Sequence, residues 1–312
     1  MNEIKHFHFQ SSDEFLNALT PRVLNQDRAA DKSFGQFIFR GVGNVEEYEL
    51  IPAAFRQSFL SEINAENIEN WNNLSQVCGE WQLLKEFFEI ADANGLPLPE
   101  DSQTLRYEIE RFDQELSAAE KNKGRDEDAA NKIVNEFPHR NFLTLLALAQ
   151  HHNLPTRLLD WSRSPYTASY FAAVSALSVE TQSVKLAVWA FKFRSHAWTS
   201  QLTHLPLQII TAPNTGNNNL KAQRGLFTLY RPEKVVWNAA VDRRPFDKVA
   251  QEIAGGEGGR REGATFLKFT LPIAEAPRLL YLLSLENVTG ASMFPNYDGV
   301  IRTMQEFRRY RR

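Results

Sequence analysis

The chain has 312 residues, a hydrophobic fraction of 43% and a formal net charge of −3, so it is long enough to bury a sizeable core as one large domain or a domain with a subdomain. The nearly balanced charge gives no overall field that would attract nucleic acid or an anionic membrane surface. A single cysteine, Cys78, excludes an internal disulfide and a cysteine-based metal cluster. No apolar run approaches the ~20 residues of a membrane span, and the first residues lack a signal pattern, so we expect a cytoplasmic protein without a membrane partner.

The first part of the chain predicts two strands and a short helix. Residues 4–9 alternate in polarity and predict a strand, after which Ser12 is placed to cap a helix that runs to about residue 19. Residues 36–41 predict a buried strand that ends at Gly41. Arg40 is therefore expected where this strand passes into a loop.

Residues 60–137 differ from the rest in composition, with many Glu, Asn, Lys and Asp residues between apolar pairs. The apolar residues recur at helical spacing at Trp81, Leu84, Phe87, Phe88, Leu105, Ile109, Phe112 and Leu116. We expect several amphipathic helices, broken at Asn94-Gly95 and turning again near residues 121–128. This block is predicted to be a helical insertion within a single unit that spans residues 1–312.

The middle of the chain predicts a buried helix, a polar turn, a second helix and a strand. Residues 142–151 are apolar at nearly every position and run directly into the polar segment 150–161. Ser164-Pro165 is a strong helix start, because serine caps a helix well and proline suits its first turn. Residues 184–193, rich in Val, Trp and Phe, predict a strand.

The last third predicts further strands and helices of unequal length. We expect a loop at 211–219, strands at 226–230 and 265–271, a connector at 255–263, a helix to about 285 and a final helix at 299–310 with a basic end. The irregular order of these elements lacks the alternation of a doubly wound fold. The sequence therefore predicts an α+β fold, with a mixed or antiparallel sheet core and a helical insertion.

The segment from Gln150 to Trp161 has the highest density of chemically active side chains. Two imidazoles, a guanidinium, a carboxylate and an indole lie within it, and such groups are costly to hold near a core unless they pair or bind a ligand. His151 and His152 point about 100° apart on a helix, and no metal-ligand spacing accompanies them, so an acid, base or hydrogen-bonding role is favoured over a metal site.

Several charged and aromatic residues have two open interpretations. Arg40 either presents its guanidinium to a phosphate or carboxylate, with Gly41 leaving room for the ligand, or pairs with an internal carboxylate such as Asp160. Arg157 either forms an ion pair that stiffens the turn or binds an anion. The aromatic residues Trp161 and Tyr170 either stack on a ligand ring or are core residues.

Several blocks of the chain carry a resemblance to the FRG-domain family, which is named for a Phe-Arg-Gly triplet. The blocks are Phe39-Arg40-Gly41, Leu50-Ile51-Pro52 with Arg56, Gln150 to Trp161, Ser164-Pro165, Tyr170-Phe171-Ala172, Ala222 to Thr228, and Phe294-Pro295 with Asp298-Gly299. They extend over most of the chain, which is identified as a member of this family. Asn153 stands where a glycine is usual, and Asn tolerates a left-handed backbone better than most residues.

The Phe-Arg-Gly strand and the Tyr-Phe-Ala helix also resemble the NAD-binding half of ADP-ribosyltransferases. That resemblance implies that Arg40 holds NAD phosphates and that a late glutamate stabilises an oxocarbenium-like transition state. Gln223 lies where the glutamate is expected and cannot supply its charge, which leaves Asp160 or Glu286 as candidate carboxylates. The expected site has catalytic candidates His151, Asp160 and Gln223, cofactor-binding candidates Arg40, Gly41, Arg157, Trp161 and Tyr170, no metal and no required cofactor, with NAD as the candidate substrate.

Two functions remain open at this stage. The first is a nucleotide-binding pocket, with ADP-ribosyl transfer or NAD cleavage as candidate reactions, formed where residues 39–41, 150–161, 166–171 and 223–225 meet. The second is a non-catalytic module of a bacterial conflict or phage-related system that binds a protein partner through residues 60–137. The two functions differ in whether Arg40 and Arg157 line a cleft or are paired inside the protein. A third function, binding of RNA or DNA, is supported only by the basic tail and scattered aromatic residues.

Overall fold

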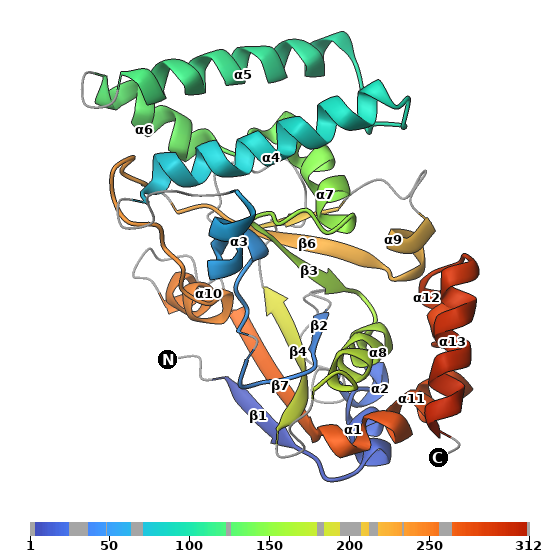
Figure 1. Cartoon of the computed structure of the whole chain (residues 1–312). Helices are drawn as coiled ribbons and strands as arrows, with labels where there is room; N and C mark the ends of the chain where they lie inside the picture. Colours follow the sequence, from blue (N-terminus) through green and yellow to red (C-terminus); the bar gives the residue numbers. More distant parts are fainter. Residues whose placement is uncertain are drawn as a thin grey trace.

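The computed structural model describes residues 4–24, 37–47, 49–63, 71–122, 126–179, 184–193, 207–211, 218–232, 234–255 and 264–310. These residues form an α+β fold in which helices surround one mixed sheet (Figure 1), so the predicted fold class is confirmed. Three predictions concern segments that fall largely outside the described residues: the loop at 211–219, the connector at 255–263 and the final pair Arg311-Arg312.

Seven strands form the sheet, in the order β1-β7-β4-β2-β3-β6-β5. They are β1 (Lys5–His8), β2 (Ile38–Val42), β3 (Leu158–Ser162), β4 (Lys185–Phe193), β5 (Leu207–Ile210), β6 (Gly225–Tyr230) and β7 (Ala264–Pro272). Strands β1 and β7 pair in parallel, and the other registered neighbours are antiparallel. Five strands match the sequence predictions, whereas β3 and β5 were not predicted.

The sheet is nearly divided in two between its central strands. The backbones of β2 and β3 share a single registered pair, Phe39 with Ser162, although each strand pairs along five positions with its other neighbour. Figure 1 shows β3 and β6 crossing the molecule at an angle to β4 and β7. The interpretation of 150–161 as a polar turn was wrong for its last residues, because Leu158, Leu159 and Trp161 are buried in a strand.

Arg40 lies inside β2 rather than at its end, since β2 continues to Val42. Helix α8 (Pro165–Ala176) covers this strand so closely that a Cβ on Gly41 would stand 1.9 Å from the backbone oxygen of Ala168. Gly41 is therefore required for helix–strand packing. This finding corrects the expectation that the glycine leaves room for a ligand.

The helices beside α8 complete one face of the sheet. They are α1 (Ser12–Ala18), α2 (Pro21–Leu24) and α11 (Ala276–Leu285), whose apolar residues share one buried cluster with α8, β4 and β7. Helix α1 is capped by Ser11, which accepts from the Glu14 backbone, and not by Ser12 as predicted. The Ser12 hydroxyl instead donates to the Glu275 carboxylate at 2.9 Å.

A second buried cluster lies beneath α10 (Phe246–Gly255), a helix that the sequence analysis did not predict. It is rich in aromatic rings: Phe191 stacks on Phe266 at 4.5 Å and meets Phe246 edge-on at 5.2 Å. Such offset and edge-on arrangements suit the quadrupoles of aromatic rings. This cluster includes Trp161, so that indole belongs to the core.

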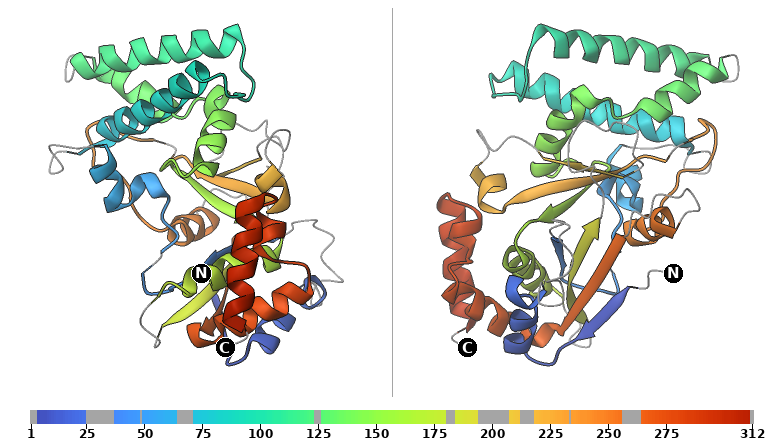
Figure 2. Two further views of the ribbon diagram at one scale, coloured as in Figure 1. Left: turned by 45° about the vertical axis from the view of Figure 1, so that its right-hand side comes forward. Right: turned by 180° about the vertical axis from the view of Figure 1, so that it is seen from behind.

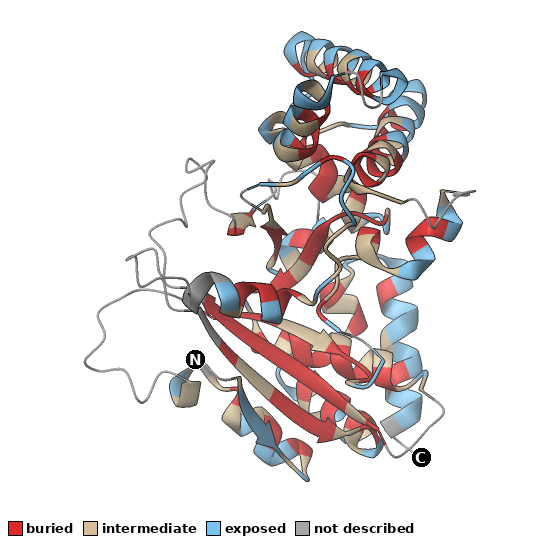
Figure 3. Ribbon diagram, turned by 90° about the vertical axis from the view of Figure 1, so that its left-hand side faces the viewer, coloured by how far each residue is buried: buried red, intermediate tan, exposed pale blue. Residues whose placement is uncertain are grey.

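The helical block of the sequence lies at one end of the molecule, above β3 and β6 (Figures 1 and 2). It consists of α3 (Gln57–Glu62), α4 (Asn73–Ala93), α5 (Gln103–Lys121), α6 (Glu127–Glu136) and α7 (Leu143–His151). Its inner faces are buried and its outer faces exposed (Figure 3), as the helical spacing predicts. The apolar residues of α4 to α7 form one continuous cluster with Leu158 of β3 and Phe227 of β6, whereas Phe59 and Leu60 of α3 form a small separate cluster.

Two helices close the chain beside α8 and α11: α12 (Gly290–Met293) and α13 (Tyr297–Tyr310). The hydroxyl of Tyr170 on α8 donates to the carboxylate of Glu306 at 2.6 Å, and both side chains are buried. A Cβ on Gly290 would stand 2.7 Å from the Cβ of Arg302, so α12 and α13 approach closely. The remaining short helix, α9 (Asn218–Ala222), precedes β6.

Candidate functional site

A cleft of about 770 Å³ opens beside the point where β2 and β3 meet. Its lining comes mainly from β2, β3, the end of α7, α8, α9, the start of β6, the segment that follows α12, and α13. The Phe-Arg-Gly strand and the 150–161 segment therefore come together as expected. Of the predicted site residues, the cleft is lined by Arg40, Gly41, His151, Asp160, Trp161 and Gln223, whereas Arg157 and Tyr170 lie outside it.

Arg40 reaches from β2 to Asp160 on β3. Its Nη1 donates to the backbone oxygen of Asp160 at 2.8 Å and lies 3.4 Å from the carboxylate Oδ2. Because β2 and β3 share only one registered pair, the Asp160 backbone oxygen receives its hydrogen bond from the Arg40 guanidinium and not from the backbone of β2. Arg40 therefore pairs with Asp160, as one of its two interpretations predicts, and it also lines the cleft; its contact with a ligand anion stays a prediction.

The Asp160 carboxylate is oriented by a chain of hydrogen bonds. The Thr156 hydroxyl donates to Gln150 Oε1 at 2.6 Å, which directs the Gln150 amide nitrogen toward Asp160 Oδ2 at 2.9 Å. The Leu158 backbone N–H donates to the same threonine hydroxyl at 3.1 Å and fixes it. The Asp160 side chain is 50% exposed, so a carboxylate held on one oxygen by two donors faces the cleft.

His151 and His152 end α7 and both line the cleft. Burial lowers the pKa of His151, His152 adds to that effect, and Asp160 opposes it in part. The His151 imidazole is therefore neutral at pH 7 and can donate or accept a hydrogen bond. Asn153, which follows, has a φ of 66°, so the predicted left-handed turn is confirmed.

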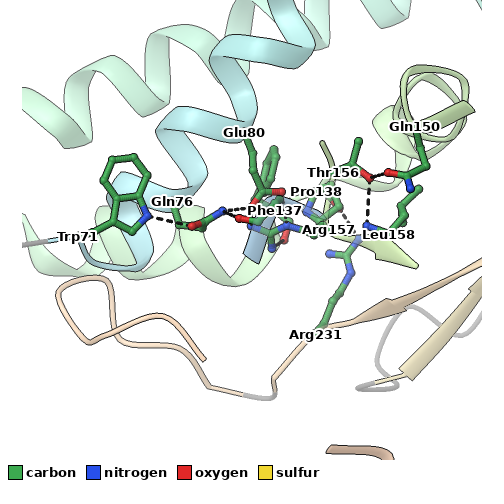
Figure 4. Close-up of polar contacts among 11 residues, drawn as sticks. Trp71, Gln76, Glu80, Phe137, Pro138, Gln150, Thr156, Arg157, Leu158 and Arg231 are labelled. Carbon is green, nitrogen blue, oxygen red and sulfur yellow. Dashed lines mark hydrogen bonds and ion pairs between the residues drawn. The ribbon is translucent and has the colours of Figure 1, made fainter. Parts of the chain in front are cut away.

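Arg157 lies on the other side of this segment and points into the helical block (Figure 4). Its Nε and Nη2 each donate to the Glu80 carboxylate on α4 at 2.8 Å, and its Nη1 donates to the Phe137 backbone oxygen at 3.2 Å. The guanidinium also lies 4.6 Å from the centroid of the Phe137 ring. The side chains of Arg157 and Glu80 are 9% and 1% exposed, which corrects the expectation that Arg157 meets a ligand anion.

Residues 98–181 match the FRG domain family. The match confirms the predicted FRG domain for residues 98–181. The matched residues include the 150–161 segment and all of α8, whereas the Phe39-Arg40-Gly41 triplet lies before the matched range. No curated protein and no solved structure is significantly similar to this chain.

The buried polar network around Arg157 extends beyond its ion pair with Glu80. Gln76 donates to Glu80 at 2.9 Å and to the Ala54 backbone oxygen at 2.8 Å, and it accepts from the Trp71 indole at 2.9 Å (Figure 4). Arg231 donates to backbone oxygens at the end of α6, and burial lowers its pKa to about 10, with a further contribution from Arg157. Arg231 is therefore still charged at neutral pH, and the described partners of both arginines are internal.

Two aromatic residues expected to stack on a ligand are instead held in the core of the domain. Tyr170 is 1% exposed and its hydroxyl binds Glu306. Trp161 lines the cleft but is 3% exposed, and its indole N–H donates to Thr228 at 2.9 Å. The core interpretation of both residues is therefore correct.

Gln223 joins the FRG domain to the C-terminal helices. Its side-chain nitrogen donates to the Met293 backbone oxygen at 3.3 Å, and its backbone oxygen accepts from the Ser162 hydroxyl at 2.7 Å. Glu286, the other candidate carboxylate, is not among the residues that line the cleft. Of the two candidate carboxylates Asp160 and Glu286, Asp160 is therefore the one that lines the cleft.

Reasoning from sequence missed Phe294, Arg302 and Glu80. Phe294 and Arg302 line the cleft together with Phe171, which lies in the predicted range 166–171, and Glu80 neutralises Arg157. Phe294 lies in an FRG motif block, which was a usable signal, whereas Glu80 is one of four acidic residues in its helix. Within the described residues no group of His, Cys, Asp and Glu suits a metal, and no helix has the length and apolar character needed to cross a membrane.

Proposed function

We propose that the cleft binds a nucleotide of the NAD type and that Asp160 is its reactive-site carboxylate. The observation that carries this proposal is the half-exposed Asp160, held by Arg40 and Gln150 at the base of a cleft of about 770 Å³. That volume lies within the range of small-molecule pockets. A fixed carboxylate with one accessible oxygen is suited to accept hydrogen bonds from ribose hydroxyls.

The same carboxylate suits cleavage of the bond between nicotinamide and ribose. Positive charge develops on the ribose as that bond breaks, and a preorganised anion stabilises this charge. Neutral His151 also lines the cleft and can hydrogen-bond the leaving group or a water molecule that attacks the ribose carbon. Phe171 and Phe294, which meet edge-on at 6.1 Å, give the cleft lining an apolar surface for a base or nicotinamide ring.

The test uses purified full-length protein and NAD. Binding is measured by titration calorimetry, and nicotinamide release is followed by chromatography. We expect Asp160→Asn to lose most turnover while its fold persists, because the Arg40 bond to the backbone oxygen remains. Glu110→Gln, on the exposed side of α5, is the matched control and should behave as the wild type. Folded wild-type protein that neither binds nor cleaves NAD would overturn the proposal.

A second candidate function is recognition of a basic protein segment by the helical block. A groove of about 560 Å³ between α4 and α5 is floored by Trp81 and Leu116 and bordered by carboxylates such as Glu86 and Glu89. Such a groove suits a basic amphipathic helix. Tryptophan fluorescence titration with a basic amphipathic peptide tests it, and a wild type that binds no better than the Glu86→Gln/Glu89→Gln variant would contradict it.

A further inference from the structure

Two of the four formally charged side chains that line the cleft are paired with each other. Arg40 and Asp160 form an ion pair at 3.4 Å, which leaves Arg302 and Asp298 on α13 as the other formal charges of its lining. Arg302 and Asp298 stand one helical turn apart, yet no ion pair within 4 Å joins Arg302 to any carboxylate in the described part of the chain. Arg302 is therefore the cleft guanidinium that is available to an anion.

Arg302 is an exposed residue whose Cβ lies in a tightly packed contact between two helices. Its Cβ packs at the close approach of α12 to α13, where a Cβ on Gly290 would stand 2.7 Å away. Helix α13 is itself fastened to α8 by the buried bond between Tyr170 and Glu306. The guanidinium lies 4.4 Å from the centroid of Phe294, and Phe294 contacts Phe171 edge-on, so three side chains form one wall of the cleft.

We propose that Arg302, positioned over Phe294, is the anion-binding residue of the cleft and takes a phosphate or diphosphate group of the ligand. A guanidinium that stacks on an aromatic ring keeps its N–H edge free for bidentate phosphate binding. This proposal rests on the proposed function, because it takes the ligand to be a nucleotide. It assigns the phosphate contact to Arg302 on α13 instead of to Arg40 of the Phe-Arg-Gly triplet. The ligand then spans the cleft, with phosphate at Arg302 and hydroxyl groups at Asp160.

The negative charge of Asp298 gives a second expectation for phosphate binding. Asp298 lines the cleft near Arg302 and repels an incoming phosphate. Asp298→Asn removes that repulsion at nearly constant volume. We therefore expect it to tighten phosphate binding by a few-fold, an effect that 0.5 M salt should reduce because salt screens charges in a solvent-accessible cleft.

The experiment titrates inorganic pyrophosphate, NAD and nicotinamide riboside into the full chain and its Arg302→Gln variant. We expect the substitution to weaken pyrophosphate and NAD by about tenfold or more and to change nicotinamide riboside, which lacks phosphate, by less than about twofold. Arg302→Lys should keep part of the affinity. Arg309→Gln, on the same helix and outside the cleft lining, is the matched control.

The possible outcomes separate the two proposals. Pyrophosphate binding that is absent from the wild type, or unchanged in Arg302→Gln, overturns the role of Arg302. If pyrophosphate binds through Arg302 while NAD and nicotinamide riboside do not bind, the anion site stands and the proposed function fails. If NAD binds with equal affinity to both proteins, the proposed function stands and the phosphate contact lies elsewhere.

Discussion

Arg157→Ala tests whether the motif arginine after the His-His pair is a structural residue. The substitution removes three hydrogen bonds, two of them to a Glu80 carboxylate that is 1% exposed. Glu80 would keep one of the donors described here, the Gln76 side-chain nitrogen at 2.9 Å. Breaking a buried ion pair from one side costs about 3–5 kcal/mol, because it leaves an uncompensated charge inside the protein.

The assay is urea denaturation followed by tryptophan fluorescence, with the free energy of unfolding obtained by linear extrapolation. We expect a loss of about 4 kcal/mol, a large part of the ~5–15 kcal/mol that holds a typical domain together. Arg40→Ala is the matched comparison. It should cost about 1–2 kcal/mol, because its side chain is 18% exposed and its partner carboxylate 50% exposed.

A double substitution that removes both Arg157 and Glu80 distinguishes the loss of the ion pair from the cost of an unpaired carboxylate. Arg157→Met combined with Glu80→Leu removes the stranded carboxylate and should recover at least half of the lost stability. Recovery should be incomplete, because Gln76 and the Phe137 backbone oxygen each lose a partner. A loss below about 1 kcal/mol for Arg157→Ala, or a loss no larger than that of Arg40→Ala, would refute the structural role.

Three further predictions concern packing and pH. Gly41→Ala places a methyl group 1.9 Å from a backbone oxygen of α8, so we expect a loss of about 2 kcal/mol or more by thermal denaturation, and an unchanged Tm would contradict the packing argument. Tyr170→Phe leaves the buried Glu306 without its hydroxyl donor and should cost about 1.5–3 kcal/mol, again read from urea denaturation; a neutral result would mean that another donor replaces it. Because burial lowers the pKa of His151, the unfolded chain binds more protons just below pH 6.5, so stability should fall as pH drops through that window, and His151→Gln should flatten the fall; parallel profiles would refute this.

The sequence predicted the elements whose pattern is local. The helices of residues 60–137 follow from apolar residues three and four apart, and the start of α8 follows from Ser164-Pro165. Strand β3 escaped prediction because its five residues follow directly on the polar residues 150–157 and were interpreted as part of the same turn. It becomes a central strand through its pairing with β6, far along the chain, and no local pattern encodes that pairing.

The candidate site was predicted in part for the same reason. The motif blocks indicated that Arg40, His151 and Asp160 meet, and the structure places them around one cleft. The sequence left open which arginine pairs internally, because that depends on where a carboxylate comes to lie in three dimensions. Glu80 reaches Arg157 across 77 positions, and Arg302 reaches the cleft from the last helix.

Strand β3 links the buried network to the cleft. Arg157 directly precedes the strand and is fixed to α4, whereas Asp160 lies within the strand and faces the cleft. The β3 backbone is paired with β6 at all five of its positions, which holds Asp160 in a fixed register. The contacts of Arg157 with Glu80 therefore anchor the start of the strand that carries the cleft carboxylate to the helical block.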